Sequence, residues 1–115
     1  MNRSMIVGAA TVLTVSLAAA AIFVVLPGAN ASEKELAAVG RDKANFCARC
    51  HGIAGITEIP TVPNLAGQNK EYIIKQLKDF RSGFRRSAPM REVALSLKNE
   101  EIIGLATYFN TLKRP

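Results

Sequence analysis

Cys47-Ala48-Arg49-Cys50-His51 is the stretch of this chain on which the fold depends. Residues three and four apart lie on one face of a helix, so the thiols of Cys47 and Cys50 and the imidazole of His51 can point the same way. This spacing matches the attachment pattern of a c-type haem, in which each thiol bonds to one vinyl group. His51 can then bind the iron from the proximal side. The motif therefore predicts one covalently attached haem c.

Two other uses of a Cys-x-x-Cys pair fit the rest of the chain less well. A redox-active disulfide of the thioredoxin kind usually accompanies a βαβ pattern, and the sequence has no such pattern. A structural zinc site takes about four protein ligands, whereas the whole chain has two Cys and one His. Haem attachment is therefore the favoured interpretation of the motif.

The first residues have the composition of a targeting segment. Arg3 gives a weakly positive start, residues 6–26 carry no charge, and residues 29–31 (Ala-Asn-Ala) satisfy the small-x-small cleavage rule. We therefore expect residues 1–31 to be a signal peptide and residues 32–115 to be a periplasmic mono-haem domain. Because the apolar run is longer than the usual ~7–15 residues, the alternative is an uncleaved anchor that holds the domain to the inner membrane, facing the periplasm.

The chain is small and basic. It has 115 residues and a formal net charge of +6, without the dense Lys/Arg block or the motifs typical of nucleic-acid binding. We therefore expect no nucleic-acid partner, and instead redox protein partners with acidic docking surfaces. Membrane contact is expected only through the leader, if it is retained. A domain this small buries a modest core, for which a covalently held haem would act as a staple.

Three amphipathic segments predict an all-α domain. The first starts at Ser32 as its cap and has an imperfect apolar stripe made of Leu36, Val39, Lys43 and Phe46. Gly40 interrupts this helix, either because another helix crosses there or because a second helix begins at Arg41. The second helix covers residues 69–81, and the third covers residues 99–112 with Asn99 as its cap.

The later helices have regular apolar stripes, which we expect to form the core. In the second, the stripe is Ile73, Leu77, Phe80 and Phe84; in the third, it is Ile102, Leu105, Ala106 and Phe109, flanked by Tyr108. The opposite face of the second helix forms a basic row that continues beyond it: Lys70, Lys75, Lys78, Arg81, Arg85, Arg86 and Arg91. This row is either a docking patch for an acidic partner or an ordinary solvated face.

Two loops complete the chain. Residues 52–67 are irregular, and the carbonyl of Pro63 is a candidate acceptor for the second ring N–H of His51, although Pro63 can equally serve only to stiffen the loop. Residues 82–91 are predicted to be a loop that contains Met90. Met1 and Met5 lie in the leader, so Met90 is the only Met or His besides His51 available as a sixth iron ligand. The alternative is a Met that fills a gap in the core.

Several motifs, in order along residues 32–115, resemble small bacterial class I c-type cytochromes, and specifically one half of the di-haem periplasmic cytochromes. They are Gly40…Lys43-Ala44…Cys47-Ala48-Arg49-Cys50-His51-Gly52, Pro63-Asn64-Leu65-Ala66-Gly67-Gln68, Tyr72…Gln76-Leu77…Phe80-Arg81-Ser82-Gly83, Met90, and Glu101-Ile102…Leu105-Ala106…Tyr108-Phe109. The resemblance implies an all-α, class I cytochrome c-like fold, with helices packed around one covalently attached haem.

The resemblance also implies roles for single residues. Cys47 and Cys50 are the thioether anchors, His51 and Met90 the axial iron ligands, and the Pro63 carbonyl the partner of His51. Gly40 permits close contact between the first and last helices near Tyr108. Gln68, Tyr72 and Arg85 are weaker candidates for the propionate region. Two features depart from the family: there is one haem motif, and Lys98 stands where a capping Ser or Asp is usual.

The implied function is periplasmic electron transport, as in a respiratory chain. A His/Met-ligated iron has no open position for a substrate, and a Met ligand raises the reduction potential. We therefore expect a one-electron carrier and not an enzyme, acting alone or as the cytochrome component of a larger oxidoreductase system. The alternative is a haem-based sensor or peroxidase-like protein in which Met90 is displaceable.

Overall fold

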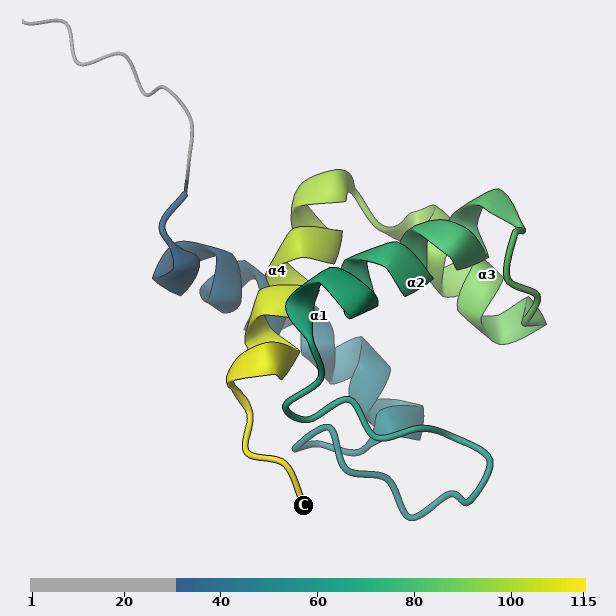
Figure 1. Cartoon of the computed structure of the whole chain (residues 1–115), viewed down its shortest axis with the longest axis horizontal. Coiled ribbons are helices and arrows are strands. Elements are labelled where there is room, and N and C mark those ends of the chain that lie inside the picture. Colours follow the sequence, from purple (N-terminus) through teal and green to yellow (C-terminus); the bar gives the residue numbers. More distant parts are fainter. Residues whose placement is uncertain (1–30) are drawn as a thin grey trace, which may run out of the picture.

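Four helices make up the part of the chain that the computed structural model describes, residues 31–115. They are α1 (Glu33–His51), α2 (Lys70–Ser82), α3 (Ala88–Ser96) and α4 (Asn99–Thr111), with no strand in that part (Figure 1). The predicted all-α class is therefore confirmed. The predicted leader, apart from its last residue, lies outside the described residues. None of the helices within residues 31–115 is long and apolar enough to cross a membrane.

Helix α1 is one continuous helix that ends in the cysteine motif. Ser32 caps it: its hydroxyl accepts a hydrogen bond from the Glu35 N–H at 3.3 Å, and the Glu35 carboxylate accepts one from the Ser32 N–H at 2.7 Å. These bonds hold the pKa of Glu35 below its usual value. Because α1 passes through Gly40 unbroken, the alternative of a helix end at Gly40 is wrong. Gly52, with φ +82°, ends the helix after His51.

Helices α1 and α4 touch backbone to backbone where they cross (Figure 1). A Cβ added to Gly40 would lie 2.0 Å from the Gly104 carbonyl oxygen, so only a glycine fits there. Gly40 thus permits the expected close contact between the first and last helices, and the closest approach is at Gly104, about one turn before Tyr108. Lys43 and Glu101 form an ion pair of 2.8 Å beside it. The close crossing holds α1, and with it the motif, on α4.

The core lies mainly between α2 and α4. All four residues of the predicted α4 stripe are buried, which confirms it: Ile102, Leu105, Ala106 and Phe109. On α2, Ile73, Leu77 and Phe80 are buried as predicted, whereas Phe84 is 83% exposed because it follows the helix end at Gly83. The α1 stripe is wrong in Val39 and Phe46, which are exposed; α1 buries Gly40, Ala44 and His51 instead.

Helix α3 covers the last four residues of a predicted loop. Residues 82–91 were expected to be irregular, but α3 begins at Ala88, with Pro89 in its first turn, where a proline has no helical hydrogen bond to lose. Met90 is therefore a helical residue. The start of α4 also differs, because its cap is Lys98 and not Asn99. The Lys98 N–H donates to the Glu101 carboxylate at 2.8 Å.

Candidate cofactor site

The last turns of α1 bring two thiols and an imidazole together. Cys47 is half-buried, Cys50 is exposed, and His51 is only 8% exposed. The two thiols are not joined in a disulfide. Thr57 donates a hydrogen bond of 2.7 Å from its hydroxyl to the Cys50 carbonyl, which ties the following loop to the end of the helix. Both thiols therefore remain available for covalent attachment.

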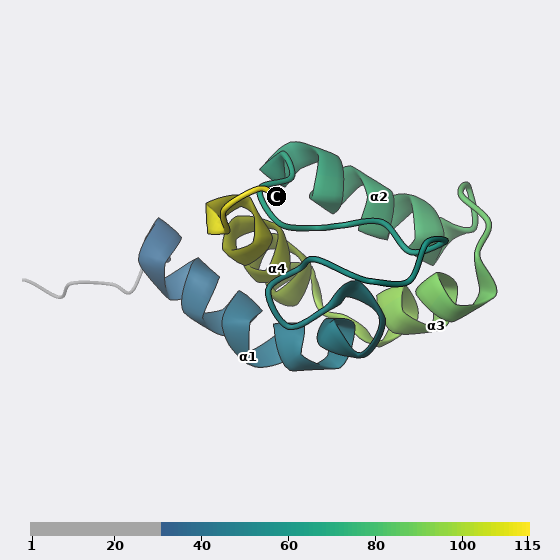
Figure 2. The same ribbon diagram turned by 90° about the horizontal axis from the view of Figure 1, so that it is seen from below.

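The ring of His51 is oriented by the loop between α1 and α2, which folds back beside the end of α1 (Figure 2). Its Nδ1 lies 2.8 Å from the Pro63 carbonyl oxygen. A carbonyl can only accept, so Nδ1 carries the proton and Nε2 keeps its lone pair for a metal. The loop is itself fixed, since the Thr57 N–H donates to the Asn64 side-chain oxygen at 2.8 Å.

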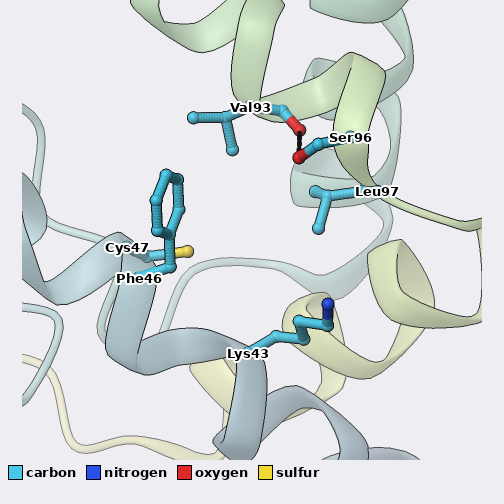
Figure 3. Close-up of a pocket in the computed structure, with 6 residues that line it drawn as sticks. All are labelled: Lys43, Phe46, Cys47, Val93, Ser96 and Leu97. Atoms are coloured by element: carbon cyan, nitrogen blue, oxygen red, sulfur yellow. Dashed lines mark hydrogen bonds between the residues drawn. The ribbon is translucent and has the colours of Figure 1, made fainter.

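Cys47 faces an apolar pocket of about 200 Å³ between α1 and the α3 region. Its sulfur points into the pocket, opposite Val93 and Leu97 (Figure 3). The other lining residues are Lys43, Phe46 and Ser96. Burial raises the pKa of the Cys47 thiol. The pocket thus places one thiol against an apolar wall, which suits the hydrocarbon face of a macrocycle.

Met90 lies on the same helix as this wall. Val93 follows Met90 by three residues, so the two side chains share one face of α3. Met90 is half-buried and packs against the hydrophobic core. The sequence prediction does not include Val93 and Leu97 as site residues, because it assigns the start of α3 to a loop. The apolar spacing of residues 90, 93 and 97 is the signal that would indicate them.

The donor set fits a covalently attached haem. Two free thiols, an imidazole with an open Nε2 and a thioether on a facing helix are the groups that bind a c-type haem through its vinyl groups and its iron. Residues 31–115 contain no cluster of three or more His, Cys, Asp or Glu side chains that could hold a bare metal ion. The residues present therefore suit a haem better than a zinc ion.

The three candidates for the propionate region lie on α2 or next to it. Gln68 and Tyr72 are at the start of α2, where the Gln68 side chain accepts from the Asn69 N–H at 2.8 Å. Arg85 lies beyond the other end of this helix, which at 1.5 Å per residue is about 20 Å long. Its guanidinium reaches back along the helix, where it donates to the Gln76 side chain and stacks on the Phe80 ring. The Arg85 guanidinium thus lies about one helical turn from Tyr72, whereas the Gln68 side chain is bonded at the start of α2.

Most cations of the predicted basic row have partners. Lys70 pairs with Glu33 and Lys75 with Asp79. Arg81 and Arg91 donate to backbone carbonyls, and Arg85 donates to Gln76. Within residues 31–115, Lys78 and Arg86 are exposed and make no ion pair or hydrogen bond through their side chains. Five of the seven cations of the row therefore have partners within the described domain, and two do not.

Comparison with known proteins agrees with this geometry. The cytochrome c family profile matches residues 37–113. Cytochrome c4 of Thiocapsa roseopersicina is 44% identical over 73 residues, which cover 63% of this chain and 38% of that protein. Cytochrome c-554(548) of Halomonas halodenitrificans is 37% identical over 78 residues, 65% of this chain and 94% of that one. The crystal structure of reduced recombinant cytochrome c4 from Pseudomonas stutzeri superposes with a TM-score of 0.62 at 31% identity, over 75% of this chain and 53% of that one. This chain thus spans less than half of the Thiocapsa sequence.

Proposed function

Since the chain belongs to the cytochrome c family, we propose that it carries single electrons between redox proteins in the periplasm, with one haem c held by Cys47, Cys50, His51 and Met90. When bound, the haem supplies reversible one-electron exchange at its iron. The chain's own residues provide attachment, ligation and an apolar surrounding. Electron transfer by a cytochrome c domain follows from the family itself.

The hydrogen bond between His51 and Pro63 is the observation that carries the proposal. At 2.8 Å it fixes the tautomer and the orientation of the ring, and a metal-binding His almost always has such a partner. The ring is also buried, at 8% exposure, so water competes poorly for its Nε2. These features prepare His51 to be a ligand, whereas a redox-active disulfide would not need them.

Met90 completes the proposed ligand set. It is the only methionine between residues 32 and 115, and His51 is the only histidine of the whole chain. If His51 and Met90 both held the iron, they would leave no open position for a substrate. A Met ligand also favours the reduced state. Both properties suit an electron carrier and not a catalyst.

The ligand set is tested by spectroscopy on protein produced in a strain that matures c-type cytochromes. The oxidised protein should show the weak far-red sulfur-to-iron band. Met90→Ala should abolish this band and allow the reduced protein to bind carbon monoxide. Leu95→Ala, on the exposed face of the same helix, is the matched control and should do neither. If the unsubstituted protein lacks the band and binds carbon monoxide rapidly, it is a ligand-binding haem protein instead.

Attachment and processing are tested by the mass of the mature protein. The expected mass is that of residues 32–115 plus one haem. Haem staining that survives denaturing electrophoresis would confirm the thioether bonds. A colourless protein from the same strain would instead support a thiol–disulfide function for Cys47 and Cys50.

A further inference from the structure

Helix α3 is weakly supported by its own sequence. It has nine residues, its cap Ser87 makes no side-chain hydrogen bond, and Ala94 is its only buried residue. A helix this short is marginal in isolation. Among the described helices, only α2 packs closely on α3 (Figures 1 and 2). Among the described helices, α2 is therefore the main support of α3 as a whole.

Arg81, at the end of α2, reaches the far end of α3. Its Nε donates to the Ala94 carbonyl at 3.1 Å and its Nη2 to the Leu97 carbonyl at 2.6 Å. Its Nη1 donates to the Asn99 side chain at 2.7 Å. The last carbonyls of a helix lack partners within the helix and carry its negative dipole end, so a guanidinium is a favourable partner there.

Arg91 makes the reverse contact at the near end of α3. It follows Met90 directly, and its Nη1 donates to the Arg81 carbonyl at 3.3 Å. The guanidinium lies over Gly83, where an added Cβ would come within 2.6 Å of Nη1. Each helix thus contributes an arginine to the backbone of the other, and Met90 directly precedes the arginine that α3 contributes.

We infer that Arg81 is a positioning residue for Met90, because its side chain fastens α3 to α2 and thereby holds the Met90 sulfur toward the site. This inference rests on the proposed function, in which Met90 is an axial ligand. The planar guanidinium reaches three acceptors in fixed directions, which the single ammonium group of a lysine cannot reproduce. Arg81, although it belongs to the basic row, therefore serves to join helices within the domain and not to bind a partner.

The test measures how easily added imidazole replaces the Met90 sulfur in the oxidised, haem-loaded protein. Arg81→Gln removes the charged fork, so α3 should leave its position more often. The apparent affinity for imidazole should rise about tenfold, which corresponds to ~1.4 kcal/mol, and the far-red band should weaken. Arg81→Lys should lie between Arg81→Gln and the unsubstituted protein, and it is the variant measured if Arg81→Gln does not accumulate.

Two controls separate positioning from general stability. Arg41→Gln, at an exposed site on α1, makes the same chemical change and should leave both readouts unaltered. Ser32→Ala removes the capping hydroxyl at the start of α1, and it lowers stability at the end of α1 opposite the motif. Equal imidazole affinities in unsubstituted protein and Arg81 variants, or an equal rise in Ser32→Ala, would overturn the inference. A missing band in the unsubstituted protein would instead overturn the ligand set itself.

Discussion

Replacing Gly40 with alanine tests whether the backbones of α1 and α4 are in contact where the two helices cross, close to the motif. The new Cβ would lie 2.0 Å from the Gly104 oxygen, 2.3 Å from its carbonyl carbon and 2.7 Å from the Leu105 nitrogen. All three are backbone atoms, so no side-chain rotation can relieve the contact. The helices must separate by more than about 1 Å before the shortest contact reaches a distance that proteins tolerate.

The expected loss follows from two opposing terms. Alanine is favoured over glycine inside a helix by about 1 kcal/mol. Overpacking of a close interior contact costs up to about 3 kcal/mol, and the upper value applies here because only backbone can move. We therefore expect Gly40→Ala to lower the free energy of unfolding by about 2 kcal/mol, and the melting temperature by roughly 10 °C for a domain of this size.

The assay is thermal and urea unfolding of the haem-loaded protein, followed by far-UV circular dichroism. Gly104→Ala should cost less, because its Cβ would meet the Leu36 oxygen at 2.8 Å and the Gly40 nitrogen at 3.0 Å. Ala38→Gly, on the exposed side of α1, measures the helix-propensity term alone. A Gly40→Ala protein as stable as the parent, or more stable, would show that the backbones are not in contact.

Two further predictions concern surface charge. Arg86→Glu, alone or with Arg85→Glu, should slow electron exchange with an acidic redox partner several-fold at low ionic strength and little at high ionic strength. Arg41→Glu on α1 is the control and should not slow it. If the parent, the Arg86 variants and Arg41→Glu all show the same salt dependence, the basic row is an ordinary solvated face. Glu101 is the second case, because its bonds to Lys43 and to the Lys98 N–H hold its pKa below the usual 4.5. A lowered pKa stabilises the fold above pH 4.5 and loses this effect as the pH falls through the lower folded value. Glu101→Gln should therefore be less stable than the parent at pH 7, and denaturation curves of the two should converge in acid, with the exposed Glu100→Gln as control; a stability difference that is independent of pH would contradict this.

The sequence predicted the elements whose signals are local. The cap at Ser32, the common face of Cys47, Cys50 and His51, and the buried stripe of α4 could each be predicted from residues within a single helix. The burial of α1 could not be read this way, because its inner face consists of Gly40 and Ala44, which are small so that α4 can approach. Large apolar residues such as Val39 and Phe46 are consequently displaced to the flanks. Apolar periodicity fails where the contact is between backbones.

The two halves of the candidate site also differ in whether they depend on local sequence or on contacts between helices. The proximal half, from Cys47 to Pro63, lies in one continuous stretch closed by hydrogen bonds within it, so the motif alone indicates its chemistry. The distal half depends on α3, whose position is set by Arg81 and Arg91 through contacts that no local pattern announces. Elimination could therefore make Met90 the candidate ligand, but it could not predict the helix that carries Met90. If Met90 is the ligand, the distal half should be the first to yield when contacts between helices are weakened, while His51 stays in place.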